Sequence, residues 1–325
     1  MISLHTATWP EARPATPAKS GRWLDIAIGL TAMAGVLATT AQGIMEQAEA
    51  DRQDAATHAT DSTHNKDDVS RMALPTRETM IGGYAGAPYT HASDVLHKKS
   101  GVHDFTVQDV NWEGQPFKSP IYYGARVVRW LEGGRSGAMV DFTHSKTLAQ
   151  LDETRSLKGT LDNAPVPAQA TLRDIYRKLE FSHGHNMLTL NGLWRLTRLA
   201  PRLWPYVGVG AGINLPHSEV QLTKVRGRTY EYQYTGPVAQ AVIGIEFRVP
   251  RMSYFLEYKF SLAQYNVPLS LRDGSVLFID LWNQFSSWLS GEEPPGGYLD
   301  TRLTSHQVIG GLGVRIGATD AAAAP

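Results

Sequence analysis

Cysteine is absent from this 325-residue chain. Without thiols, the protein has no disulfide scaffold, thiolate zinc site, iron–sulfur cluster or cysteine nucleophile. An excess of either charge is also lacking, because 31 basic side chains balance 31 acidic ones. This balance argues against a globally basic surface and therefore against a nucleic-acid partner. Any catalysis must use histidine, carboxylate, hydroxyl or lysine groups.

The first 77 residues differ in composition from the rest of the chain. An apolar run from Ile26 to Ala41 follows a polar start and ends in small residues, which predicts a signal peptide over residues 1–41. Asp25 stands at the mouth of this run, so an uncleaved N-terminal anchor remains an alternative. Residues 42–77 contain almost no large apolar side chain, and we expect a disordered periplasmic arm there. A short disordered tail is expected over residues 318–325.

Long apolar runs are missing after Ala41, which excludes a membrane-spanning helix in the mature chain. Apolar and polar residues alternate instead, in segments near the length of a tilted membrane strand. The sequence therefore predicts an all-β fold over residues 78–317, a closed antiparallel transmembrane β-barrel of about eight strands. The expected strands are residues 79–88, 121–131, 136–146, 183–197, 203–214, 237–249, 252–263 and 303–316.

The connections between these segments alternate between short and long. Short periplasmic turns and long extracellular loops are typical of bacterial outer-membrane barrels. We therefore expect an integral protein of the Gram-negative outer membrane, with a soluble up-and-down barrel as the alternative. Strand parity turns six charged residues into the lumen, where they must pair to offset desolvation. They are Arg126, Arg195, Glu246, Arg248, Glu257 and Lys259.

Histidines gather near the ends of the predicted strands that adjoin long loops. His183 and His185 are two residues apart, so a regular strand would point both toward the lumen. Two imidazoles on one face are a usual start to a metal site. Further residues at the same rim can complete it: His91, His144, His217, Asp141, Glu180 and Glu231. Parity places His144 and His306 on the lipid side unless a bulge turns them inward.

The last long loop contains apolar residues at helical spacing over residues 280–289, including Trp282 and Trp288. Asp280 is expected to cap this helix, and Gly291 to end it. Its apolar face can lie on the outer leaflet or cover a substrate at the rim. Packing against other loops is the alternative.

Several runs of the chain resemble the rhizobial lipid A oxidase family of the outer membrane. They are residues 82–91, 116–118, 121–124, 141–146, 179–192, 230–237 and 255–260. The resemblance implies an enzyme that uses dioxygen as co-substrate to convert the proximal glucosamine of lipid A to 2-aminogluconate, releasing hydrogen peroxide. Lipid A, within lipopolysaccharide, is then the partner, and we expect a monomer.

Oxidation of a sugar by dioxygen needs an electron carrier or a redox metal. The glycines between Gly208 and Gly212 lie in a predicted strand without a following helix, so they are no nucleotide-binding fingerprint. A divalent transition metal is the economical alternative. The predicted site comprises the metal ligands His183, His185, His91 and His217, the catalytic carboxylates Asp141 and Glu180, and the substrate-binding residues Lys146, Trp282 and Trp288.

Two other functions remain open. A non-catalytic barrel, serving as an adhesin or envelope stabiliser, explains the strand pattern equally well. A lipid A acyl hydrolase or acyltransferase would pair Ser182 with His183 or Ser305 with His306. Adjacent residues of a regular strand point to opposite faces, which argues against both pairs.

Overall fold

The computed structural model describes residues 77–317. The predicted signal segment, the arm up to residue 76 and the tail 318–325 lie outside the described residues. Within residues 77–317, no helix has both the length and the apolarity needed to cross a membrane.

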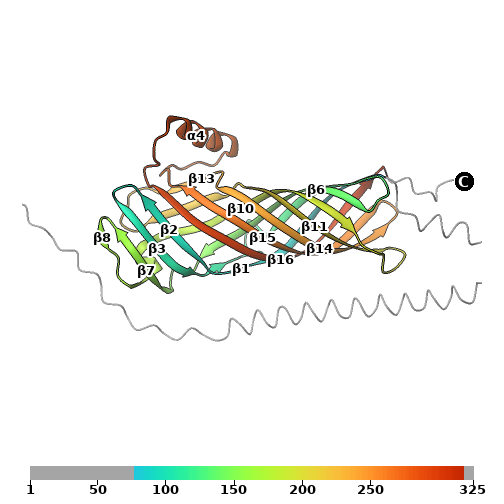
Figure 1. Ribbon diagram of the computed structural model, residues 1–325, viewed down its shortest axis with the longest axis horizontal. Coiled ribbons are helices and arrows are strands. Elements are labelled where there is room, and N and C mark those ends of the chain that lie inside the picture. The colour runs from blue at the N-terminus through green and yellow to red at the C-terminus, as the bar shows by residue number, and fades with distance from the viewer. Residues whose placement is uncertain (1–76, 318–325) are drawn as a thin grey trace, which may run out of the picture. The chain divides into compact units, whose positions relative to one another are not determined.

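Eight strands within the described residues form a closed antiparallel ring (Figure 1). Each strand pairs with the next, and β1 closes the ring by pairing with β16 from Thr79↔Ile316 to Thr90↔Ser305. The predicted fold class is therefore confirmed. In ring order the strands are β1 (Glu78–Thr90), β5 (Tyr123–Trp130), β6 (Ser136–Ala149), β10 (Tyr176–Arg195), β11 (Leu203–Asn214), β14 (Gly236–Val249), β15 (Met252–Pro268) and β16 (Tyr298–Ile316).

The long connections are not structureless loops, because they extend the barrel wall at one end. β2 pairs with the start of β16, β3 and β7 continue that sheet, and β12 pairs with the start of β10. The added elements are β2 (Ser93–Lys99), β3 (His103–Val110), β4 (Trp112–Glu113), β7 (Thr154–Leu161), β8 (Ala164–Pro165), β9 (Gln169–Thr171), α3 (Leu172–Ile175), β12 (His217–Leu222), β13 (Thr229–Tyr232) and α4 (Leu277–Ser290). We assign this end to the extracellular side and the short-turn end to the periplasm.

The outer wall of the barrel carries an apolar belt. Leu190, Val209 and Ile243 are each more than half exposed, at 61%, 57% and 55%. Trp194 and Tyr254 add exposed aromatic rings near the short turns. Such a surface is unfavourable in water and suited to lipid, and aromatic girdles flank the lipid-facing band of membrane barrels. The protein is therefore an integral outer-membrane barrel.

Side chains fill the lumen at the extracellular end of the barrel and again farther down. A large apolar core that includes Phe105, Tyr176 and Phe181 occupies the extracellular end. Farther down, a cavity of about 10 Å³ beside Met80 and Phe255 is at the lower limit for one water molecule. Around this cavity the side chains leave room for no more than about one water molecule.

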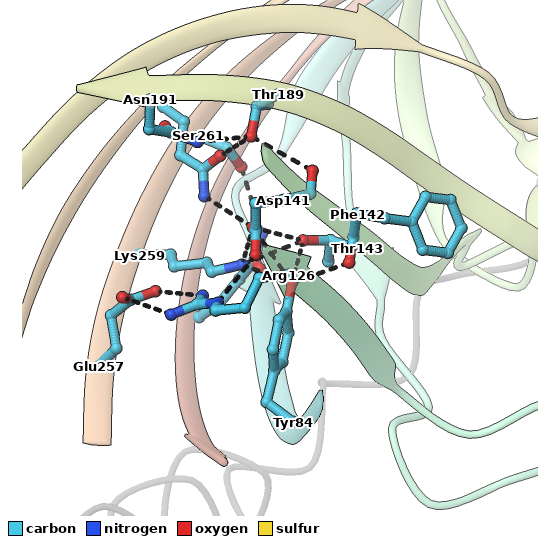
Figure 2. A network of polar contacts seen from close by, with 12 residues as sticks. Tyr84, Arg126, Asp141, Phe142, Thr143, Thr189, Asn191, Glu257, Lys259 and Ser261 are labelled. Atoms are coloured by element: carbon cyan, nitrogen blue, oxygen red, sulfur yellow. Dashed lines mark hydrogen bonds and ion pairs between the residues drawn. The ribbon is translucent and has the colours of Figure 1, made fainter. Parts of the chain in front are cut away.

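Two ionic networks lie inside the barrel. In the first, Arg126 donates to Glu257 at 2.9 Å and to Asp141 at 3.1 Å, and Lys259 also pairs with Asp141. Figure 2 shows Tyr84 and Thr143 converging on the same carboxylate.

The second network lies near the periplasmic end. Glu78 accepts from Arg195 at 2.7 Å and pairs with Arg248 and Arg315, while Glu246 accepts from Arg195 at 2.8 Å. The expectation that charges within the lumen pair with one another is confirmed.

Candidate functional site

Asp141 does not lie at the rim, contrary to the predicted catalytic role there. Its side chain is inside the barrel between Arg126 and Lys259, and the residue is 1% exposed. The reason is its height, since Asp141 lies on β6 only a short way above the turn that precedes Ser136. Both of its oxygens are used by neighbours, so its position is that of a structural counter-ion.

His183 and His185 do not share a face. The pairing of β10 with β6 is regular up to His185↔Ser145 and resumes at Phe181↔Thr147, so extra residues bulge out of β10. Gly184, at the bulge, has φ +146°, a backbone conformation that side chains rarely permit. As a result, His183 is exposed. His185 is buried, and its Nδ1 contacts the hydroxyl of Tyr265. The rule that residues two apart share a face of a strand fails wherever a bulge inserts extra residues.

The four predicted metal ligands therefore do not form one site. His91 lies beside His306 on the wall formed by β1 and β16, and His185 is inside the barrel. Only His183 and His217 meet, with ring centroids 5.4 Å apart. Within residues 77–317, no three His, Asp or Glu side chains gather into a group able to hold a metal ion. His183, His185, His91 and His217 thus do not form the expected four-histidine metal site within the described residues.

What assembles instead is an outward-facing group on β10, β12 and β13, which we call the outer-wall patch. The pairing of β10 with β12 sets Glu180 opposite Glu219, and that of β12 with β13 sets Glu219 opposite Tyr230. The His217 ring lies 4.3 Å from the Tyr230 ring. The patch comprises Glu180, Ser182, His183, His217, Glu219 and Tyr230.

The two carboxylates of the patch are held by cations and a hydroxyl. Glu180 accepts from Lys178 at 3.0 Å and from Ser182 at 2.8 Å, and Glu219 accepts from Arg228 at 2.9 Å. Burial raises the pKa of Glu219, and the carboxylate of Glu180 adds to the rise, against the opposing charge of Lys178. A carboxyl with a raised pKa can hold or accept a proton near neutral pH.

His217 is the buried base of the patch. It is 2% exposed, and its Nε2 lies 3.2 Å from the carbonyl oxygen of Gly274. Among residues 77–317, its Nδ1 has no hydrogen-bond partner. Burial lowers the pKa of His217, which favours the neutral imidazole. A neutral ring whose Nε2 donates to Gly274 has a free lone pair on Nδ1, beneath the exposed ring of His183.

Lys146 lies at the edge of the patch. Its Nζ donates to the carbonyl oxygen of Ser119 at 2.6 Å, and it is close enough to Glu180 and Lys118 to interact electrostatically with both. The ammonium groups of Lys118, Lys146 and Lys178 together form a cationic border to the patch. Such a border suits an anionic group such as a phosphate.

Helix α4 stands beside the patch and is set to the side of the barrel wall (Figure 1). Asp280 does not cap the helix, contrary to expectation. Its buried carboxylate accepts from the backbone N–H of Tyr232, next to His217 in the β12–β13 pairing. Gln284 bonds both backbone groups of Tyr234, so the polar face of α4 is anchored to the barrel. Gly291 ends the helix in the left-handed conformation, as expected.

The opposite face of α4 is apolar and exposed. Trp282 is 66% exposed and Trp288 78% exposed, with Phe278 and Leu289 beside them. A tilted strand crosses the bilayer in about 9–11 residues, and His183 lies about that far along β10 from Trp194 in the periplasmic girdle. The patch and α4 are therefore at the height of the outer-leaflet headgroups.

Sequence reasoning missed three members of the patch. Glu219 lies two residues after His217 and shares its face of β12. The alternation of strand residues was therefore enough to predict that Glu219 lies beside His217. Tyr230 joins the patch through the pairing of β12 with β13, which the sequence did not predict. Ser182 was set aside because it adjoins His183, yet the bulge brings its Oγ to 3.2 Å from Nδ1 of His183.

Comparisons with known proteins give a general likeness to outer-membrane barrels. No protein-family model matches the chain, and no curated protein does. Among solved structures, the outer membrane protein OprG from Pseudomonas aeruginosa is 9% identical, with 76% of this chain and 98% of that one covered and a TM-score of 0.38. Neisserial surface protein A is 9% identical, with 73% and 95% covered and a TM-score of 0.30.

The outer membrane protease OmpT from Escherichia coli is also 9% identical, with 74% and 95% covered and a TM-score of 0.31. At scores this low, the fold assignment rests on the strand pairing of the chain itself.

Proposed function

We propose that this protein modifies lipid A from the outer wall of its barrel, oxidising the proximal glucosamine with dioxygen. The observation that supports the proposal is the convergence of Lys146, Glu180, His183 and His217 beside α4, at headgroup height. Lipid A brings a phosphorylated sugar next to acyl chains. The cationic border suits the phosphate, and the apolar face of α4 suits the chains.

The reaction implied by the family resemblance places definite demands on the patch. The C1 hydroxyl of the sugar loses its proton, and C1 loses its hydrogen with an electron pair. An electron carrier or redox metal would pass these two electrons to dioxygen, which takes up two protons to become hydrogen peroxide. Water then opens the resulting lactone to the carboxylate, so the lipid gains one oxygen. Glu180 and Glu219 are the groups that would accept the hydroxyl proton, because one carboxyl of such a pair is a base while the other retains its proton.

This assignment is tested by replacing Glu180 with Gln in the full-length protein and measuring oxidised lipid A by mass spectrometry. Loss of a general base lowers kcat/KM by about 10²–10⁴-fold. Asp104→Asn is the matched control, an exposed carboxylate on β3 outside the patch. Equal activity in Glu180→Gln and in the wild type would remove the patch from the reaction.

Acyl hydrolysis is the second candidate, favoured by one contact. The Oγ of Ser182 lies 3.2 Å from Nδ1 of His183, within reach of a nucleophile–base pair. Ser182 also donates to Glu180, however, so the carboxylate engages the hydroxyl and not the imidazole. In a nucleophilic triad the acid orients the base, and that contact is missing here. Loss of an acyl chain, abolished by Ser182→Ala, would support hydrolysis over oxidation.

A further inference from the structure

A second histidine cluster lies on a different wall of the barrel, formed by β1, β16 and β15. His306 on β16 is paired in register with Tyr89 on β1 and with Phe260 on β15. His91 follows β1 directly, and its backbone N–H bonds to Thr304. β5 and β6 lie between β1 and β10, so this wall is separate from the outer-wall patch.

The imidazoles of this cluster face each other. The Nε2 atoms of His91 and His306 lie 2.8 Å apart, and Nδ1 of His306 contacts the hydroxyl of Tyr258. The Tyr89 ring is 5.0 Å from the His91 ring and 6.4 Å from the His306 ring. We call Tyr89, His91, Tyr258 and His306 the two-histidine cluster.

The position of this cluster is unusual for a purely structural contact. Below it, the same faces carry exposed apolar residues such as Leu256, Leu312 and Val314, as lipid requires. His306 lies about as far from the periplasmic end at Ile316 as a strand needs to cross the bilayer, which places the cluster at headgroup height. A hydrogen bond between exposed side chains adds little to barrel stability.

The arrangement brings two imidazole nitrogens close enough to share one metal ion. If Nδ1 of His306 donates its hydrogen to Tyr258, its Nε2 keeps a lone pair directed at His91, and such an outer contact is what orients a ligating histidine. His91 needs only to move its hydrogen from Nε2 to Nδ1 for both Nε2 atoms to become ligands. The ring of Tyr89 packs edge-on against the ring of His91.

We propose that the two-histidine cluster binds one divalent transition metal through His91 and His306, with Tyr258 orienting His306. Imidazole ligands suit copper, zinc, iron or nickel, whereas magnesium and calcium prefer oxygen ligands. The site does not depend on the proposed function, because it lies on another wall and shares no residue with the patch.

The test is a titration of the purified full-length protein with Cu²⁺, which has the highest affinity of the divalent first-row metals for such ligands. His5, His58 and His64, which lie outside the described residues, are replaced by Ala in every sample. We expect one tightly bound Cu²⁺ whose electron paramagnetic resonance spectrum shows coupling to imidazole nitrogen. His91→Ala and His306→Ala should each abolish this species, and Tyr258→Phe should weaken binding about 10–100-fold.

His183→Ala, on the patch, is the matched control and should bind Cu²⁺ like the parent. Heat-dependent migration on gels verifies that each variant keeps its barrel. Unchanged Cu²⁺ binding in the His91→Ala, His306→Ala double variant, or no tight binding by the parent, would overturn the proposal. Since no lipid A is present, either result leaves the test of the proposed function untouched.

Discussion

Asp141 shows how a single carboxylate serves the lumen of the barrel. It neutralises Lys259 and shares Arg126 with Glu257, so four charges balance in a space from which water is excluded. Removing one partner of a buried pair leaves an uncompensated charge, which costs far more than the pair itself contributes. The alternation of strand residues predicted that Arg126, Glu257 and Lys259 face the lumen. It did not show that Asp141 lies among these charges and not at the extracellular rim.

We therefore expect Asp141→Asn to destabilise the barrel by about 3–5 kcal/mol. Urea unfolding in detergent micelles measures the loss. Asp104→Asn, an exposed substitution, should stay within about 0.5 kcal/mol of the wild type. A stable Asp141→Asn barrel that has lost only lipid A modification would restore the catalytic role that the sequence suggested.

Glu219 makes stability depend on pH in a predictable direction. Its pKa is raised in the folded protein, so the folded state binds its proton more tightly than the unfolded chain does. The associated stability is fully present below the ordinary carboxyl pKa and is lost as pH rises through the raised value. Glu219→Gln should flatten the stability profile over that window. Unfolding midpoints in urea, measured from pH 4 upward, check this; an unchanged slope would contradict it.

The elements that the sequence predicted best are those with regular alternation. All eight ring strands were expected near their observed positions, because lipid outside and polar side chains inside impose period two. The extracellular extension was missed, since β2, β3 and β7 bury an apolar core against the barrel and carry no lipid-facing pattern. The bulge at Gly184 also escaped, and with it the true orientation of His183.

Helix α4 is expected to lie in the outer leaflet with its apolar face down. The absence of cysteine allows a single fluorescent label at a chosen position. A label at Leu289→Cys should be quenched by spin-labelled lipid in vesicles, whereas a label at Ser287→Cys, on the side that contacts Arg272, should be quenched less. Equal quenching at both sites would mean that the helix does not rest on the membrane.

At the level of the whole molecule, the described part of the barrel is filled inside, and its candidate sites lie on the outer wall. Its lumen is filled by ion pairs and an apolar core, while the patch, α4 and the two-histidine cluster are all on the outside. Composition and alternation were enough to predict the closed barrel. The outer-wall patch and the two-histidine cluster could not be predicted in this way. They form through the pairing of segments far apart in the sequence, which no local pattern encodes.

The orientation of the barrel follows from its connections and is open to labelling. Single cysteines at Ser156 and Ser275, in the extracellular extension, should react with an impermeant reagent on intact cells. A cysteine at Ala200, in a short turn, should react only after the outer membrane is opened. The reverse pattern would invert the barrel and move the patch and α4 away from the outer leaflet.

The most direct measurement is the mass of lipid A that carries a free C1 hydroxyl, after incubation with the purified full-length protein in vesicles under air, with hydrogen peroxide measured in parallel. Oxidation predicts a gain of one oxygen per lipid and one peroxide per oxygen gained. In ¹⁸O-labelled water the label enters the lipid, because the added oxygen comes from lactone opening. Unchanged lipid A, or lipid A that loses an acyl chain without peroxide, would contradict the proposed oxidation.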